Sequence, residues 1–396
     1  MPQLSIMIVA GERSGDVYGA GLAQALQARL PGVEVFGAGG DAMRQAGVDT
    51  TVDSHEIAIA GITEIVEGYP RVFRAFHRLV GEADRRHPQL AILIDFPDFN
   101  LRLARQLKQR RIPVVYFVSP QVWAWRKGRV KTLKKRIAKM IVIFDFEEEI
   151  YREAGVPVEY VGHPLVDMVR PTLTREEFFA KTELDPSVQT IALLPGSRQK
   201  EVSVNLPIIL DAAKRLSLNR KLQFVIPVAP TIQQKWLEST IPRSSASPVR
   251  IRTAMHATYD ALQYSEVAVV TSGTATLEAA MCERPMVMVY RVSTLTWLVG
   301  KLLVKVPYFS IVNILAKREL VPELMQEDFT AANVAARVEY LLDHPEARAE
   351  MVRGFQALKA RLGQSGAIER AADSMIEVLN SSHATQKAAQ TAAPMK

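Results

Sequence analysis

The sequence predicts an α/β protein made of two Rossmann-like domains, whose parallel sheets face each other across a cleft and are followed by C-terminal helices. Short runs rich in valine and isoleucine recur along the chain. They are apolar throughout, as strands buried on both faces of a parallel sheet are. Longer amphipathic stretches separate them, as in a series of βαβ units. The 396 residues suffice for two or three domains of roughly 100–200 residues.

The composition is that of a folded protein. Hydrophobic residues make up 48% and charged residues 23% of the chain, which is too apolar for a disordered protein. The net charge of +7 suggests an anionic partner without distinguishing nucleic acid, a lipid surface or a phosphorylated metabolite. The single cysteine, Cys282, excludes an internal disulfide framework. We expect a cytoplasmic protein, because the sequence shows no signal peptide and no apolar run near the ~18–20 residues that span a bilayer.

The first domain is predicted over residues 1–168. Its strands are expected at 4–10, 33–39, 90–95, 113–119, 139–144 and 158–164. Ligands of such sheets bind beyond the carboxyl ends of the strands. The residues that follow each strand are therefore the candidates for chemistry.

The first strand leads into GERSGD at 11–16, where glycine permits a sharp turn and a close approach of backbone amides to a ligand. Two interpretations stay open: a turn capped by Ser14 or Asp16, and a binding loop. Glu12 favours the binding loop, because a carboxylate at a strand end points into the cleft.

The third strand ends in IDFPDFN at 94–100. Asp95 comes directly from the strand, and partial burial by Phe96 would raise its pKa toward that of a useful base. Either Asp98 or Asn100 is expected to cap the next helix. We therefore choose Asp95 as the functional carboxylate.

The following strand leads into VSPQVWAWR at 118–126. Trp123 and Trp125 lie close to Arg126 there. This combination of aromatic and basic residues is explained by core packing beside a solvated basic helix. Stacking on nucleic acid, or docking of a phosphorylated amphiphile, explains it equally well. The sequence does not discriminate between these interpretations.

The second domain is predicted over residues 169–345, after a polar, helix-like segment at 171–189 interrupts the strand pattern. Its strands are expected at 190–197, 222–228, 248–254, 267–273 and 285–291. Gly196, Ser197 and Arg198 supply a glycine turn, a hydroxyl and a guanidinium at a helix N-terminus. This is the set of groups that a pyrophosphate needs.

A second turn of this kind, TSGTATLE at 271–278, follows the fourth strand of the second domain. Its glycine and the hydroxyls between Ser272 and Thr276 can meet phosphate oxygens, and Glu278 suits a pair of ribose hydroxyls. Each motif alone could be a helix N-cap. Two of them at strand ends of one domain predict a nucleotide-diphosphate site.

No metal site is expected, because the seven histidines form no H-E-x-x-H motif and no D-x-D is present. His163 is interpreted as a structural residue at the crossover between the domains. Helices are predicted over 346–380, packing back across the domains, and a disordered tail over 381–396.

Two amphipathic stretches, 62–80 and 295–309, carry arginine or lysine beside an apolar stripe. A core helix is the default interpretation of each. A basic amphipathic face also fits interfacial binding to anionic lipid.

Seven motifs, in this order, resemble those of the lipid-A-disaccharide synthase family over roughly residues 4–380: GERSGD, IDFPDFN, VSPQVWAWR, GHPLVD, LLPGSRQKEV, SGTATLE and NILAKRELVPELMQ. The resemblance implies an inverting glycosyltransferase of GT-B fold that needs no cofactor. Its substrates would be UDP-2,3-diacylglucosamine and 2,3-diacylglucosamine 1-phosphate (lipid X), and its products a β-1,6-linked disaccharide and UDP.

The resemblance also implies roles for residues. Asp95 would be the base on the acceptor 6-hydroxyl, with Glu12 as the alternative. The UDP-sugar would be bound by Gly196, Ser197, Arg198, Glu201, Ser272, Gly273, Thr274, Thr276, Glu278, Asn313 and Arg318. The acceptor would be bound by Ser14, Asp98, Trp123 and Arg126.

The resemblance implies a peripheral protein at the cytoplasmic surface of the inner membrane, without a nucleic-acid partner. The oligomeric state stays open, and a homodimer is one possibility. Two other functions stay open: a GT-B enzyme for a soluble UDP-sugar, and a basic nucleic-acid-binding protein. The second leaves the diphosphate motifs unexplained and has no RNA-binding module signature.

Overall fold

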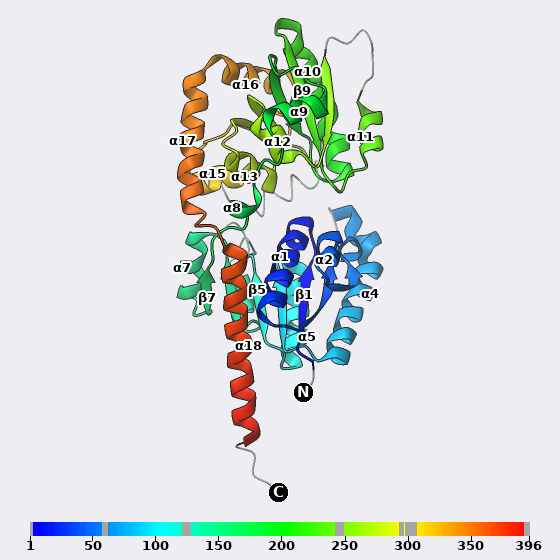
Figure 1. Cartoon of the computed structure of the whole chain (residues 1–396), viewed down its shortest axis with the longest axis vertical. Helices are drawn as coiled ribbons and strands as arrows, with labels where there is room; N and C mark the ends of the chain where they lie inside the picture. The colour runs from blue at the N-terminus through cyan, green and yellow to red at the C-terminus, as the bar shows by residue number, and fades with distance from the viewer. Residues whose placement is uncertain are drawn as a thin grey trace. The chain divides into compact units, whose positions relative to one another are not determined.

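The computed structural model describes residues 3–57, 62–120, 128–241, 249–292, 297 and 307–391, with the backbone alone for 62–69 and 383–391. The chain forms two compact units (Figure 1). Unit 1 is Met1–Pro164 together with Leu362–Lys396, and unit 2 is Leu165–Arg361.

Unit 1 is built on a seven-stranded parallel sheet of order β3-β2-β1-β4-β5-β6-β7. Its strands are β1 (Ser5–Ala10), β2 (Glu34–Gly39), β3 (Asp49–Asp53), β4 (Leu90–Ile94), β5 (Val114–Phe117), β6 (Lys139–Val142) and β7 (Val158–Tyr160). The strand order reverses between β1 and β4. The loops after these two strands therefore lie at the topological switch point, where open α/β sheets bind ligands.

Helices cover the sheet of unit 1. They are α1 (Arg13–Arg29), α2 (Asp41–Gln45), α3 (Ser54–Ile57), α4 (Ile62–Arg86), α5 (Pro97–Gln109), α6 (Arg129–Lys134), α7 (Asp145–Glu153) and α18 (Ala367–Thr391). Buried residues of α4 and α5, such as Leu79 and Leu103, pack with alternate strand residues such as Val9 and Leu93 in one core. Because both faces of the sheet are covered at its centre, strands β4 and β5 are apolar and buried along their whole length, as predicted.

Unit 2 has a six-stranded parallel sheet of order β10-β9-β8-β11-β12-β13. Its strands are β8 (Gln189–Leu194), β9 (Leu222–Val228), β10 (Arg250–Met255), β11 (Val267–Thr271), β12 (Met286–Tyr290) and β13 (Glu323–Met325). The order reverses between β8 and β11, the two strands that precede the predicted diphosphate turns. Its helices are α8 (Leu165–Met168), α9 (Arg175–Thr182), α10 (Gln199–Asn219), α11 (Gln234–Thr240), α12 (Thr258–Gln263), α13 (Thr274–Met281), α15 (Ile311–Ala316), α16 (Ala331–Asp343) and α17 (Pro345–Arg361).

The division of the chain differs from the predicted one in detail. The first boundary lies after Pro164 and not after residue 168, and α17 belongs to unit 2 while α18 belongs to unit 1. Helix α18 packs on α1, where Arg29 pairs with Asp373 at 2.6 Å. It continues to Thr391, through residues for which a disordered tail was predicted, because alanine, glutamine and lysine support a helix despite their low complexity.

The stretch 62–80 is part of α4, and most of its described apolar residues are core. Leu79 is buried, and Val72, Phe76 and Val80 pack against the same cluster. Phe73 alone among these is exposed, with 52% of its surface accessible. The interpretation as a membrane-facing stripe is therefore wrong for the buried residues, because a core helix has the same periodicity. Most of the stretch 295–309 lies outside the described residues.

Candidate active site

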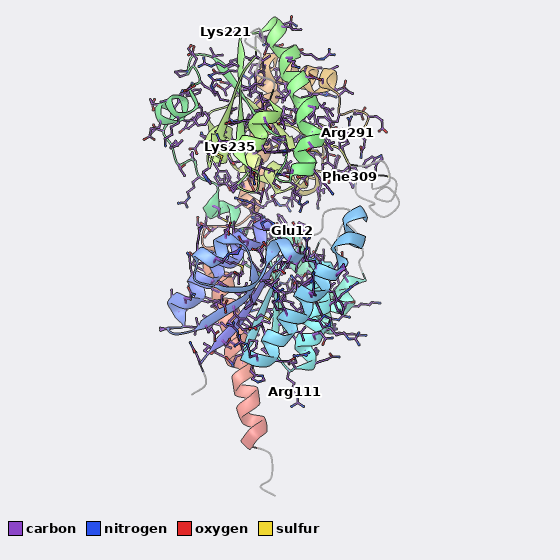
Figure 2. All side chains as sticks on the ribbon, turned by 90° about the vertical axis from the view of Figure 1, so that its right-hand side faces the viewer. Glu12, Arg111, Lys221, Lys235, Arg291 and Phe309 are labelled. Atoms are coloured by element: carbon purple, nitrogen blue, oxygen red, sulfur yellow. The ribbon has the colours of Figure 1, made fainter. Side chains whose placement is uncertain are left out.

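The loops after β1 and β4 lie against each other in unit 1. A Cβ atom on Gly11 would lie 2.4 Å from the ring of Phe96, so glycine is required for this close approach. Glu12 follows at once and begins α1 as its N-cap residue. Figure 2 shows its exposed side chain at the edge of unit 1 where the strands end.

Asp95 leaves the end of β4 in a left-handed backbone conformation, with φ of 44°, and Phe96 follows with φ of 49°. The Asp95 N–H donates to the carbonyl oxygen of Phe117 at 2.9 Å. Its own carbonyl oxygen accepts hydrogen bonds from the Tyr116 hydroxyl and from the Asn100 side-chain amide, the latter at 2.8 Å. The residue is therefore held by strand β5 and by helix α5.

The pKa of the Asp95 carboxyl is raised to about 7. Burial is the larger cause and the negative charge of Glu12 the second; a hydrogen bond from the Phe96 N–H and the charge of Arg129 act in the opposite direction. A carboxylate that titrates near neutral pH is suited to general-base catalysis. Burial was predicted to raise the pKa of Asp95, and the direction of the shift agrees with that prediction.

Neither Asp98 nor Asn100 caps α5, contrary to the expectation. The N-cap residue is Phe96, and no side chain makes the cap hydrogen bond. The Asn100 amide instead donates to the carbonyl oxygens of Ile94 and Asp95. Asp98 is exposed and pairs with the largely buried guanidinium of Arg129. Arg129 was not among the predicted site residues, although it follows the tryptophan-rich motif closely.

The GERSGD motif contains one structural carboxylate. Asp16 is buried and accepts hydrogen bonds from the N–H groups of Gly40, Ala42 and Met43 at 2.6, 3.0 and 3.2 Å. It therefore caps α2, and neither it nor Ser14 makes a side-chain cap for α1. Ser14 lies in the first turn of α1 and is partly exposed.

Two further predictions concern unit 1. Trp123 and Arg126 lie outside the described residues. His163 is buried, and burial lowers its pKa to about 3, so its imidazole is neutral at physiological pH. The backbone N–H of His163 donates to the carbonyl oxygen of Leu362, which fits the structural role expected at the crossover. No group of three potential metal ligands occurs in the part of the chain that the structure describes.

In unit 2, the turn after β8 presents groups suited to an anion. Gly196 has φ of 131°, and the exposed Ser197 and Arg198 precede α10. The Glu201 carboxylate accepts from the Ser197 N–H and from the Arg198 guanidinium, both at 3.3 Å. The Ser197 amide and the Arg198 guanidinium thus both donate to one negatively charged group, the Glu201 carboxylate.

Tyr290, at the carboxyl end of β12, is a neighbour that the sequence did not reveal. Its phenol has a raised pKa, chiefly because of burial and secondly because of the Glu201 charge, with Arg198 acting against them. It places a hydroxyl near the Gly196–Glu201 turn. No motif marks it in the sequence, and in the sheet β12 is separated from β8 by β11.

The turn after β11 contributes Ser272, Gly273 and Thr274, and Gly273 has φ of 142°. These residues are exposed or partly exposed, and so is Glu278 one turn into α13. Thr276, by contrast, is wholly buried, and its hydroxyl donates to the Gly273 carbonyl oxygen at 2.8 Å. It stabilises the turn and does not face a ligand, which corrects the prediction for this residue.

Asn205 of α10 connects the two turns. It is buried, and its amide donates to the Pro195 carbonyl oxygen at 3.1 Å and to the Thr271 hydroxyl at 3.3 Å. Pro195 follows β8 directly and Thr271 ends β11, and these are the two strands of the switch point. Asn205 therefore holds the turns together, a role that its place in the middle of a helix did not predict.

Asn313 is not arranged as the prediction requires, whereas the role of Arg318 in binding the donor stays a prediction. Asn313 is buried; its amide donates to the Val321 carbonyl oxygen and to Glu323, both at 2.8 Å, and its oxygen accepts from the N–H groups of Leu320 and Val321. All its hydrogen-bonding capacity thus goes to the loop before β13 and to the first residue of that strand. Arg318 is half-exposed and pairs with Glu350 of α17 at 2.9 Å.

Comparison with known sequences gives consistent matches over almost the whole chain. A model of the lipid-A-disaccharide synthetase family matches residues 6–374. The chain is 46% identical over 381 residues to the lipid-A-disaccharide synthase of Koribacter versatilis. This match covers 95% of this chain and 98% of that protein. It is 44% identical to the enzyme of the same name from Myxococcus xanthus, over 94% of this chain and 97% of that protein.

Solved structures share the fold at low identity. One is the UDP-GlcNAc 2-epimerase from Neisseria meningitidis bound to UDP-GlcNAc, with a TM-score of 0.60, 12% identity and coverage of 94% of this chain and 100% of that chain. Another is the glycotransferase of kitacinnamycin, with a TM-score of 0.63, 13% identity and coverage of 95% and 99%. The predicted GT-B fold, with two Rossmann-like domains, is confirmed.

Proposed function

The chain belongs to the lipid-A-disaccharide synthase family, and on that premise we propose that it joins UDP-2,3-diacylglucosamine to lipid X with Asp95 as the general base. It is a glycosyltransferase of lipid A biosynthesis. The observation that carries the assignment of the base is the carboxyl group of Asp95, which stands at the switch point of the first sheet with a pKa raised to about 7. At neutral pH a large fraction of this group is ionised and able to accept a proton.

The proposed reaction is a single displacement with inversion. The Asp95 carboxylate takes the proton of the acceptor 6-hydroxyl, and that oxygen forms a bond to the anomeric carbon of the donor. The bond between this carbon and the UDP oxygen breaks, and UDP leaves with the electron pair. The product is a β-1,6-linked disaccharide 1-phosphate.

The leaving diphosphate is assigned to the turn of Gly196, Ser197 and Arg198. An amide N–H and a guanidinium are strong donors to phosphate oxygens, and both already contact the Glu201 carboxylate in unit 2. Ser272, Gly273 and Thr274 of the neighbouring turn would bind further phosphate oxygens, and Glu278 the ribose. We propose that no metal ion takes part, since the sequence has no D-x-D motif.

The acceptor is assigned to unit 1, beside Asp95. Arg129 supplies a positive charge near this carboxyl group, as the 1-phosphate of lipid X would require. Ser14 and Asp98 lie in the adjoining helix turns after β1 and β4. Glu12 then acts through its charge on Asp95, and the alternative of Glu12 as the base is less favoured because its side chain is exposed.

Because both substrates carry acyl chains, we propose that the protein works at the cytoplasmic surface of the inner membrane as a peripheral protein. None of the described helices is long and apolar enough to span a bilayer. The exposed Phe73 on α4, with Arg71 and Arg74 beside it in the sequence, is the described feature that supports contact with lipid.

The test is product formation. Purified protein is incubated with UDP-2,3-diacylglucosamine and lipid X, and the products are separated by mass. We expect a disaccharide 1-phosphate and UDP in equal amounts. Release of UDP without a disaccharide, or turnover of UDP-GlcNAc without an acylated acceptor, would contradict the proposed function.

A further inference from the structure

The backbone at Asp95 and Phe96 is unusual. Both residues carry a Cβ atom, and both have positive φ, at 44° and 49°. Residues other than glycine rarely adopt this conformation, and two in succession persist only where their surroundings hold them. The conformation decides the direction in which the Asp95 side chain leaves the end of β4.

Two buried side chains hold this backbone from different elements. The Tyr116 hydroxyl, on β5, donates to the Asp95 carbonyl oxygen. The Asn100 amide, on α5, donates to the same oxygen at 2.8 Å and to the carbonyl oxygen of Ile94 at 3.1 Å. Tyr116 and Asn100 have no accessible surface, so neither can contact a substrate.

We propose that Tyr116 and Asn100 are positioning residues for the reaction, which keep residues 95 and 96 left-handed and so direct the Asp95 carboxylate into the site. The inference rests on the proposed role of Asp95 as the base. Without the two donors, the Asp95 carbonyl oxygen would be released and the peptide after it could rotate toward the ordinary extended or helical regions. The carboxylate would then turn away from the acceptor hydroxyl.

The chemistry of Tyr116 suits this role. Burial, and secondly the charge of Asp95, raise the pKa of its phenol well above the ordinary value. The hydroxyl therefore stays protonated and keeps donating at every pH at which the enzyme works. Its ring belongs to the core on the face of α4 and α5, so the direction of the O–H group is fixed by packing.

The test compares two phenol deletions. Tyr116→Phe removes the hydroxyl and keeps the ring. Tyr264→Phe is the matched control, because the Tyr264 hydroxyl also donates to a backbone carbonyl, that of Leu173 at 2.6 Å, but does so in unit 2. Turnover, KM for each substrate, the pH dependence of kcat and the melting temperature are measured for both.

We expect Tyr116→Phe to lower kcat about 10- to 100-fold with KM for the UDP-sugar unchanged, since small displacements of a reacting group have effects of this size. The acidic limb of its pH profile should move to lower pH, because a carboxylate that turns to solvent recovers an ordinary pKa. Tyr264→Phe should retain the wild-type kcat and profile. Asn100→Leu, which removes the amide donor without adding a charge, should lower kcat and move the acidic limb in the same direction as Tyr116→Phe.

A double variant separates positioning from general stability. In Asp95→Asn, the addition of Tyr116→Phe should reduce kcat no further, because the hydroxyl acts only through Asp95. The inference is overturned if Tyr116→Phe keeps the wild-type kcat and pH profile while Asp95→Asn is inactive, or if the two losses multiply. Wild-type turnover of Asp95→Asn itself would instead overturn the assignment of the base, and this inference with it.

Discussion

The negative charge of Glu12 raises the pKa of the Asp95 carboxyl group, although the two residues follow different strands and are far apart in the sequence. They become neighbours because β1 and β4 pair in register and end together, with Ala10 opposite Ile94. A pair of carboxyl groups in different environments, one exposed and one largely buried, is a recurrent way of separating acid–base roles in enzymes. This relationship makes pH the natural variable for testing the site.

The first prediction concerns Glu12→Gln. Removing the negative charge should lower the pKa of Asp95, so that the carboxylate forms at lower pH. The acidic limb of kcat/KM should therefore move to lower pH, while activity at pH 8 changes little. Asp41→Asn is the control, because it removes an equally negative but highly exposed group after β2 and should leave the limb in place. A loss of activity at all pH values in Glu12→Gln would indicate that Glu12 itself is the base.

The second prediction concerns stability. The pKa of Asp95 is about 7 in the folded protein, compared with an ordinary value of 3.8. Between these values the folded state binds the proton more tightly, so the contribution of Asp95 to stability falls as pH rises from about 4 to about 7. Asp95→Asn lacks this charge and should melt at a higher temperature than the wild type, by a larger margin at pH 8 than at pH 5.

Thermal melts at both pH values check this prediction, with Asp41→Asn as the matched carboxyl-to-amide change. An Asp95→Asn protein that is less stable than the wild type at pH 8 would mean that the buried charge has a compensating partner.

The third prediction separates residues that contact the nucleotide from those that shape the fold. Arg198→Ala should weaken UDP binding about 10- to 100-fold, because it removes a charge-assisted hydrogen bond, with little change in melting temperature. Asn313→Ala should do the reverse: it leaves buried partners such as the Leu320 N–H unsatisfied, which costs about 1–3 kcal/mol of stability or more. Calorimetric titration with UDP, below the melting temperature of each variant, measures the difference.

Lys214→Ala is the control for Arg198→Ala, since it removes a cation from the same helix, α10, in an exposed pair with Asp211. UDP affinity that is unchanged in Arg198→Ala and lost in Asn313→Ala would reverse the assignment of the two residues.

The fourth prediction concerns the lipid surface. Phe73→Ser should reduce binding to vesicles that contain anionic lipid, and its melting temperature should stay close to that of the wild type because more than half of the side chain is exposed. Val72→Ser is the matched variant on the adjacent, core-facing position and should lower stability by about 1–3 kcal/mol without a specific effect on vesicle binding. Equal vesicle binding of the wild type and Phe73→Ser would exclude Phe73 from the membrane contact.

Much of the fold followed from the sequence because its strands are buried on both faces. A run such as LAILID is apolar on both faces, so in a βα series it forms a strand that is buried in a parallel sheet. The residues at the carboxyl ends of such strands lie where these sheets bind ligands. Strands β3 and β13 lie at the edges of their sheets and were not predicted, because Val52 is the one apolar residue of β3 and β13 has only three residues. The helical continuation of α18 to Thr391 was missed because composition alone suggested disorder.

Site residues were predictable from the sequence where a motif directly follows a strand. They were not predictable where the role of a residue depends on the direction of its side chain. Asn313 belongs to a motif, yet its amide contacts a loop up to ten residues later in the chain. Asn100 was expected at a cap and holds the backbone of Asp95. Tyr116 gave no signal, because one tyrosine in a buried strand has the same pattern as any core residue. Such contacts are set by packing in three dimensions.

Turnover by the Asp95→Asn variant shows whether Asp95 takes the proton of the acceptor hydroxyl. The substitution keeps the shape of the side chain but removes its ability to accept a proton. With UDP-2,3-diacylglucosamine and lipid X at saturating concentrations and pH 8, we expect a loss of about 10²–10⁴ in kcat, with UDP affinity retained and a melting temperature no lower than that of the wild type. If a folded Asp95→Asn protein turns over nearly as fast as the wild type, Asp95 is not the base.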